Sequence, residues 1–176
     1  MRKYLLLLLV LALSFTTAFA ADENTIIIKT SKPVGTTVSL DAYTASKDEA
    51  FTVDWGDGEE KTYNVDPNGW GYSRRIKTEI KGETITIKGK LVNFDLTEAG
   101  ITSVDLHGQT ALKDINLEKN EIATFKQDGM PALTKLDLKD NKLTTFSGKG
   151  MTSLNKLNLQ AGQTHQIELP VNSLSK

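Results

Sequence analysis

The second half of the chain repeats an apolar pattern every 21 residues, and this repeat constrains the fold more than any other feature of the sequence. In steps of 21 from Leu91, apolar residues fall in the same five columns of successive segments. The columns hold Leu91, Leu112, Leu133 and Leu154; Phe94, Ile115, Leu136 and Leu157; Leu96, Leu117, Leu138 and Leu159; Ile101, Ile122 and Leu143; and Val104, Phe125, Phe146 and Ile167. Such a repeat predicts stacked coils, because one unit is too small to bury its own apolar face.

Each unit reads L-x-x-L-x-L-x-x-N-x-L-x-x-F, which predicts a short strand followed by a turn. Two apolar residues spaced two apart point to the same face of a strand, so neighbouring coils would form a parallel sheet. Asn120 and Asn141 follow the strand, where a side-chain amide can bond the backbone of the turn and of the next coil. A coil of 21 residues leaves little room for a helix, and we expect extended or 3₁₀ segments on its other side.

These columns resemble the leucine-rich repeat family, in short bacterial forms such as internalin-like proteins and the secreted repeat proteins of Bacteroidetes. The segment Ala132-Leu133-Thr134-Lys135-Leu136-Asp137-Leu138-Lys139-Asp140-Asn141-Lys142-Leu143 carries the resemblance most fully. The resemblance implies a solenoid with a parallel sheet and a role in binding proteins or other ligands. It implies four repeats, at 91–111, 112–132, 133–153 and 154–174.

Residues 21–90 predict a small antiparallel β-sandwich that would cover the open end of the repeat stack. Short β-like runs alternate with turn residues such as Asp57-Gly58 and Lys81-Gly82. The last run ends close to Leu91, so we expect no flexible linker. The expected strands are 25–30, 36–43, 51–55, 61–65, 74–80 and 83–88.

The motif Asp54-Trp55-Gly56-Asp57-Gly58 resembles the W-G-D-G turn of extracellular PKD-like β-sandwich domains. Turn chemistry explains each residue: glycines adopt positive φ, and aspartate caps the amides of a turn. The alternative is a calcium site at Asp54, Asp57, Glu59 and Glu60, but calcium needs six or more oxygen ligands and the spacing does not match an EF-hand loop. We therefore favour the turn and expect no cofactor.

Two surfaces are candidates for ligand binding. The first is the outward face of the repeat strands, which is polar and mixed in charge: Asn93, Asp95, Asp114, Asn116, Lys135 and Asp137. A solvated face with side chains bonded across strands is the alternative interpretation. The second is an aromatic cluster, formed by Trp55, Tyr63, Trp70 and Tyr72. Trp70 and Tyr72 lie in a loop-like segment and could anchor a partner or a sugar, whereas packing in the core is the alternative for all four rings.

The first 20 residues have the layout of a secretory signal peptide. Arg2 and Lys3 precede a nine-residue apolar run, and Ala18-Phe19-Ala20 matches a small-x-small cleavage site. The run is too short for a transmembrane helix, which needs about 20 apolar residues. We expect cleavage before Ala21 and an exported protein, secreted, on the cell surface or in the periplasm, with no membrane insertion.

Composition excludes several classes of partner and of chemistry. Without residues 1–20 the chain has 19 basic and 22 acidic residues, a net charge of about −3, which argues against nucleic acid and anionic membranes as partners. The absence of cysteine excludes disulfides, thiol catalysis and cysteine zinc sites. His107 and His165 are the only histidines, and no nucleophile elbow or metal-binding histidine pair is present, so we expect no enzyme.

These features together predict a non-catalytic exported module for protein–protein or protein–glycan recognition, such as adhesion at the bacterial cell surface. The alternative is a structural or assembly component of the cell envelope, which would close its open repeat end on a partner or a second copy. We expect a monomer, with a dimer through the C-terminal repeat as the alternative.

Overall fold

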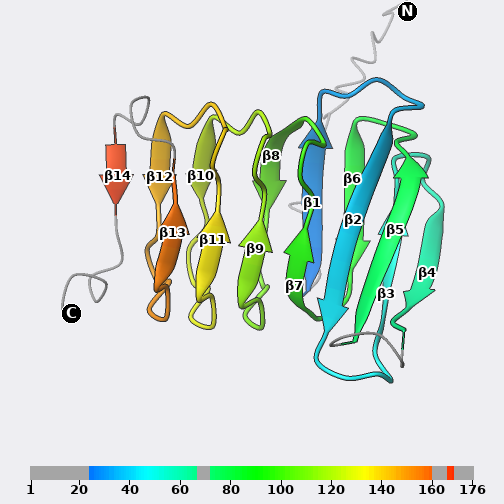
Figure 1. Cartoon of the computed structure of the whole chain (residues 1–176), viewed down its shortest axis with the longest axis horizontal. Coiled ribbons are helices and arrows are strands. Elements are labelled where there is room, and N and C mark those ends of the chain that lie inside the picture. Colours follow the sequence, from blue (N-terminus) through cyan, green and yellow to red (C-terminus); the bar gives the residue numbers. More distant parts are fainter. Residues whose placement is uncertain (1–23, 67–71, 160–165, 169–176) are drawn as a thin grey trace, which may run out of the picture.

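The computed structural model describes residues 24–66, 72–159 and 166–168, and every helix or strand in these ranges is a β-strand. Figure 1 shows an elongated molecule in which a broad antiparallel part continues into a row of stacked parallel strands. The expected fold class, an antiparallel sandwich-like part followed by a β-solenoid, is therefore confirmed, with a solenoid of about three turns. Within the described ranges, no helix has the length and apolar character needed to cross a bilayer.

The antiparallel part contains the six strands expected from the sequence, with boundaries shifted by no more than one residue. They are β1 (Thr25–Thr30), β2 (Thr37–Thr44), β3 (Ala50–Asp54), β4 (Glu60–Asn64), β5 (Ser73–Glu79) and β6 (Thr84–Lys88). The repeats supply β7 (Leu91–Asp95), β8 (Ile101–Asp105), β9 (Asp114–Asn116), β10 (Thr124–Lys126), β11 (Lys135–Asp137), β12 (Thr145–Ser147), β13 (Lys156–Asn158) and β14 (Gln166–Glu168).

Three sheets organise these strands. A five-stranded sheet has the order β4-β3-β6-β1-β8, and a three-stranded parallel sheet has the order β10-β12-β14. A six-stranded sheet has the order β13-β11-β9-β7-β2-β5, so it combines parallel repeat strands with antiparallel strands of the N-terminal part. On the side of each coil opposite its first strand we expected either extended or 3₁₀ segments, and the structure has short extended strands there.

The first coil joins the two halves of the molecule on both sides. Strand β7 pairs antiparallel with β2 and parallel with β9, while β8 pairs antiparallel with β1. The N-terminal sandwich thus supplies a hydrogen-bonded neighbour for both strands of the first coil, and the six-stranded sheet continues from the sandwich strand β2 into the repeat strand β7 without a break.

The core follows the columns of the repeat. Leu91, Leu112 and Leu133 are fully buried, and the column of Phe94, Ile115 and Leu136 is at most 2 % exposed. Phe125 and Phe146 stack with ring centroids 5.9 Å apart, one coil above the next. In the sandwich, Ile26, Ile28, Ile85, Ile87, Leu40, Phe51 and Val53 form the corresponding buried layer. Burial of these side chains provides the main stabilisation of a chain without disulfides.

The asparagine column satisfies the backbone where each strand ends. The Oδ1 atom of Asn120 accepts hydrogen bonds from the amides of Ala99 and Ile101 in the preceding coil, each at 3.0 Å. Its Nδ2 atom donates to the carbonyls of Leu96 and Leu117. Asn141 repeats this arrangement one coil later. In the second and third coils one asparagine side chain therefore pairs backbone groups of its own turn and of the preceding coil, as the sequence predicted.

Candidate functional site: the outer face of the six-stranded sheet

One row of polar side chains crosses the whole outer face of the six-stranded sheet. Each residue is the register partner of the next across neighbouring strands. We call this set the polar row: Arg75, Asp41, Asp95, Asn116, Asp137 and Asn158. Three of the candidate residues chosen from the sequence lie in it, and the row extends beyond the repeats onto β2 and β5.

A second row lies two residues earlier in each repeat strand and therefore on the same face. We call it the Tyr43 row: Ser73, Tyr43, Asn93, Asp114, Lys135 and Lys156. It contains the other three repeat-face candidates. The six repeat-face residues chosen from the sequence are thus brought together on one surface.

The side chains of the polar row are held by hydrogen bonds before any partner arrives. Asp95 Oδ1 accepts bonds from the amide and the hydroxyl of Thr97, at 3.2 and 2.7 Å. Asn116 and Asp137 likewise accept the backbone amide two residues later, each at 3.0 Å. These bonds fix the side chains at the ends of their strands, which lowers the conformational entropy lost when a partner binds.

Bonds across strands join the polar row in pairs. Asn116 Nδ2 donates to Asp95 Oδ2 at 2.7 Å, and Asn158 donates in the same way to Asp137. Arg75 donates two bonds of 2.7 and 2.9 Å to Asp41, and hydrogen bonding to this carboxylate raises the pKa of Arg75. The solvated-ladder interpretation therefore describes these bonds well, and a ladder of this kind is compatible with binding.

Two shallow hollows lie side by side on this face and share Asp114 and Asn116. The first is lined by Tyr43, Asn93, Phe94, Asp95, Asp114 and Asn116. The second is lined by Asp114, Asn116, Lys135, Leu136, Asp137, Lys156 and Asn158. The repeats contribute no aromatic ring to this face, but Tyr43 adds one from β2. The sequence analysis missed Tyr43, because the face was traced only from Leu91 onward.

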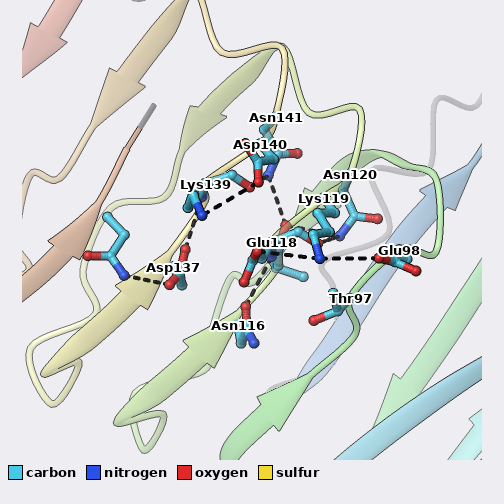
Figure 2. A network of polar contacts seen from close by, with 12 residues as sticks. Thr97, Glu98, Asn116, Glu118, Lys119, Asn120, Asp137, Lys139, Asp140 and Asn141 are labelled. Atoms are coloured by element: carbon cyan, nitrogen blue, oxygen red, sulfur yellow. Dashed lines mark hydrogen bonds and ion pairs between the residues drawn. The ribbon is translucent and has the colours of Figure 1, made fainter. Parts of the chain in front are cut away.

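Charged side chains also follow the exits of the repeat strands, next to the polar row (Figure 2). Lys119 lies between Glu98 of the preceding coil, at 3.4 Å, and Glu118, at 3.8 Å. The hydrogen bond with Glu98 raises the pKa of Lys119. Glu98, Lys119 and Asp140 occupy equivalent positions 21 residues apart, and all three have left-handed backbone angles, with φ between 54 and 57°. The network is exposed, so it adds little to stability.

The aromatic cluster divides into buried and exposed parts. Trp55 and Tyr63 are 4 % and 8 % exposed, and the indole Nε1 of Trp55 donates to the Tyr63 hydroxyl at 3.2 Å. Both rings belong to the sandwich core, where Tyr63 also stacks on Phe51. Tyr72 is 40 % exposed. Trp70, the other loop residue that we considered as an anchor, lies outside the described residues.

The W-G-D-G segment forms a tight turn held by its own aspartates. Asp54 Oδ1 accepts the amides of Gly56 and Gly58, at 2.8 and 3.0 Å. Asp57 pairs with Lys81, whose hydrogen bond lowers the pKa of the Asp57 carboxyl. Gly56 has φ of 110°, and a Cβ atom there would lie 2.4 Å from the backbone nitrogen of Gly82, so only glycine fits. These carboxylates are occupied by turn amides and a lysine.

Among the residues that the structure describes, no three His, Asp or Glu side chains gather in the way that a metal ion would need. His107 pairs with Asp105 on the surface, and its side chain is 67 % exposed. His165 and the segment 1–20 of the expected signal peptide lie outside the described ranges.

Two glutamines, Gln127 and Gln109, are buried between the coils, and the sequence did not identify either of them. Gln127 accepts the amide of Leu106 at 2.9 Å and donates to the carbonyl of Val104 at 2.9 Å, one coil earlier. Gln109 is 1 % exposed, and neither of its side-chain polar atoms has a hydrogen-bond partner. The signal for Gln127 was its place between apolar columns, where a long amide can reach the neighbouring coil.

Comparisons with protein-family models, with curated proteins and with solved structures found no match.

Proposed function

We propose that this protein is an exported, non-catalytic binding module that recognises a partner protein through the outer face of the six-stranded sheet. The observation that supports this most is the continuity of that face: the polar row and the Tyr43 row cross six strands and expose ordered hydrogen-bonding groups. The sequence features of residues 1–20 support the proposal that it acts outside the cytoplasm. The likeness of its repeat to leucine-rich repeats, whose members are usually binders, supports the same function.

The architecture favours a flat protein surface as the ligand over a small molecule. The two hollows are shallow and adjoin each other, and their lining is mostly polar. Small-molecule sites are usually concave and mostly apolar. Protein interfaces instead combine an apolar centre, rich in aromatic side chains, with a polar rim. Tyr43, between polar neighbours, has the chemistry of such a central anchor.

The absence of cysteine allows a direct test by site-specific crosslinking. Asn93 lies in the first hollow, and its side chain makes no hydrogen bond to the described residues, so Asn93→Cys should fold normally. The variant would be labelled with a photoreactive benzophenone. It would then be mixed with cell-surface and secreted proteins, both from the source organism and from the cells it lives among, and irradiated. Asp48→Cys is the matched control, since Asp48 is exposed and lies outside both hollows.

A defined protein crosslinked from position 93, absent from position 48 and competed by excess unlabelled protein, is the expected result. Equal labelling from both positions would contradict recognition through this face. Binding on a glycan array in place of any protein crosslink would move the proposal to a carbohydrate ligand.

The edge of the solenoid supports a second candidate, the assembly component. Strand β13 is the outermost strand of the six-stranded sheet within the described residues, and Leu157 in it and Leu159 just after it are less buried than their counterparts in the preceding coils. An edge strand offers backbone groups to a further strand. Light scattering on the purified protein distinguishes the two: a stable dimer that β13 variants disrupt favours assembly, and a monomer favours the binding module.

A further inference from the structure

The repeat part of the outer face has an acidic residue beside the sandwich and a basic residue on its C-terminal strand, and neither forms an ion pair with the described residues. Among the described residues, Asp95 on β7 makes hydrogen bonds only with neutral groups, the backbone amide and hydroxyl of Thr97 and the side-chain amide of Asn116. Lys156 on β13 makes no ion pair with any residue that the structure describes. The neighbouring charges Asp114 and Lys135 form an ion pair at 3.2 Å, as do Asp41 and Arg75, whereas Asp137, between β9 and β13, bonds to neutral amides as Asp95 does.

The two hollows reproduce this asymmetry. The first contains Asp95 and Asp114 beside the ring of Tyr43, and no cation lines it. The second contains two cations, Lys135 and Lys156; Lys135 pairs with Asp114, and Asp137 accepts the backbone amide of Lys139 and the side-chain amide of Asn158. A partner without opposite charges would remove water from Asp95 and Lys156 on binding and offer no ion pair in return, and this would cost binding free energy.

We propose that the partner is a protein segment with a cationic side chain seated beside Asp95 and Tyr43 and an anionic side chain seated beside Lys156. This inference rests on the proposed function and names the chemistry of its ligand. Strands β7 and β13 are three strand spacings apart and Lys156 lies two residues earlier in the register than Asp95, so the two charges of the partner lie about 16 Å apart. The Tyr43 ring adds a cation–π contact for an arginine or lysine in the first hollow.

The order of the charges also sets the direction in which the segment lies. Its cation points toward the sandwich and its anion toward the C-terminal coils, because reversing it would place like charges together at both ends. Such an arrangement contributes to specificity and to the rate of association more than to affinity.

The test uses nuclear magnetic resonance on the purified exported protein with three defined probes. They are N-acetyl-arginine amide, N-acetyl-glutamate amide, and the acetylated and amidated hexapeptide RGSGSE, whose flexible spacer has a mean span of about 12 Å. The arginine probe should shift the amides around Asn93 and Asp95, and the glutamate probe those around Lys156 and Asn158. The hexapeptide should bind at least about tenfold more tightly than either single probe, because its second contact is intramolecular.

Matched variants separate charge from structure. Asp95→Asn keeps an oxygen that can accept the Thr97 bonds, but it removes the charge and the acceptor of the Asn116 amide, and Lys156→Gln removes the charge on β13. Each should reduce hexapeptide affinity to that of a single probe, whereas Asp48→Asn, away from the face, should leave it unchanged. The tenfold gain should also shrink as salt rises, because exposed charges are screened.

Three outcomes would overturn the inference. The first is equal affinity for the hexapeptide and the single probes. The second is the absence of shifts on this face at about 20 mM hexapeptide, which saturates even a millimolar site. The third is concentration-dependent shifts of the same residues in protein alone, which would make a second copy the occupant. If any of these occurs while position 93 still crosslinks to a partner, the surface is correct and only its charge chemistry is wrong; if the crosslink fails too, the proposed function falls with it.

Discussion

The side-chain nitrogen of Asn120 donates a 2.9 Å hydrogen bond to the carbonyl of Leu96, which lies 24 residues earlier and one coil away. The same side chain accepts the amides of Ala99 and Ile101 from that coil. One amide therefore closes its own turn and ties it to the previous turn. The stack depends on such bonds because strands of three residues, such as β9 and β11, form few backbone bonds of their own.

Replacing this asparagine should destabilise the protein more than replacing its counterpart in the next coil. Asn120 is 5 % exposed, and Asn120→Ala leaves several buried backbone groups without partners, at about 2–5 kcal/mol in the free energy of unfolding. Asn141 is half-buried, so water replaces part of what Asn141→Ala removes, and about 1–3 kcal/mol is expected. Urea titration of both variants measures the difference. An equal loss would contradict the role of burial.

The register of the repeat strands makes a second prediction, on two adjacent residues. Leu136 is 1 % exposed in the core, and Leu136→Ala should cost about 2–5 kcal/mol through lost burial and a cavity. Asp137 points outward and accepts the amide of Lys139, so Asp137→Ala should cost only about 0.5–1.5 kcal/mol. Chemical denaturation measures both losses in the free energy of unfolding. A larger loss for Asp137→Ala than for Leu136→Ala would mean that Asp137 faces the core and Leu136 faces outward.

The sequence predicted these core positions because the repeat aligns them four times. Leu112, Leu133 and Leu154 could each be assigned from the others, and the asparagine column gave the turns in the same way. The pairing of β2 with β7 has no such signal, since strand order in a sheet depends on contacts between segments far apart in sequence. Tyr43 therefore could not be placed beside Asn93 and Asp114 from the sequence, although both repeat residues were chosen correctly as neighbours on one face.

A third prediction concerns Gln109, a buried polar residue at the position that Met130 and Met151 occupy in the next two coils. Because both polar atoms of its side chain are buried without partners, Gln109→Met should stabilise the protein by about 1–3 kcal/mol.

The matched control is Gln127→Met, the same substitution at a glutamine that is bonded to Leu106 and Val104. It should destabilise by about 1–3 kcal/mol, since it strands both backbone groups. Thermal unfolding followed by circular dichroism compares the two variants. Changes of the same sign would show that the buried amide of Gln109 is satisfied, for example by a water molecule.

Acid should weaken the protein partly through two surface carboxylates. The hydrogen bond from Lys81 lowers the pKa of Asp57, and hydrogen bonds from Lys142 and Ser31 lower the pKa of Glu121. A carboxyl whose pKa is lower in the folded state stabilises the fold above its unfolded pKa, near 4, and this stabilisation is lost as the pH falls through the folded value.

The urea midpoint of the wild type should therefore drop between about pH 5 and pH 3, and the double variant Asp57→Asn, Glu121→Gln should drop less over the same interval. Asp48→Asn serves as the control, because the Asp48 side chain is 83 % exposed. Identical pH profiles for the wild type and the double variant would show that neither ion pair forms in solution.

Within the described residues, strands β9 to β12 pair only with other repeat strands, while β2 and β1 pair with the first coil. One side-chain bond, from Ser31 to Glu121, also joins the second coil to the sandwich. Length is therefore a free variable of this architecture. A duplication or loss of 21 residues in the middle of the stack would leave the sandwich junction untouched and would widen or narrow the outer face by one strand, about 4.8 Å. Related chains with different numbers of coils would then present outer faces of different width beside the same sandwich junction, and so would fit partners of different size.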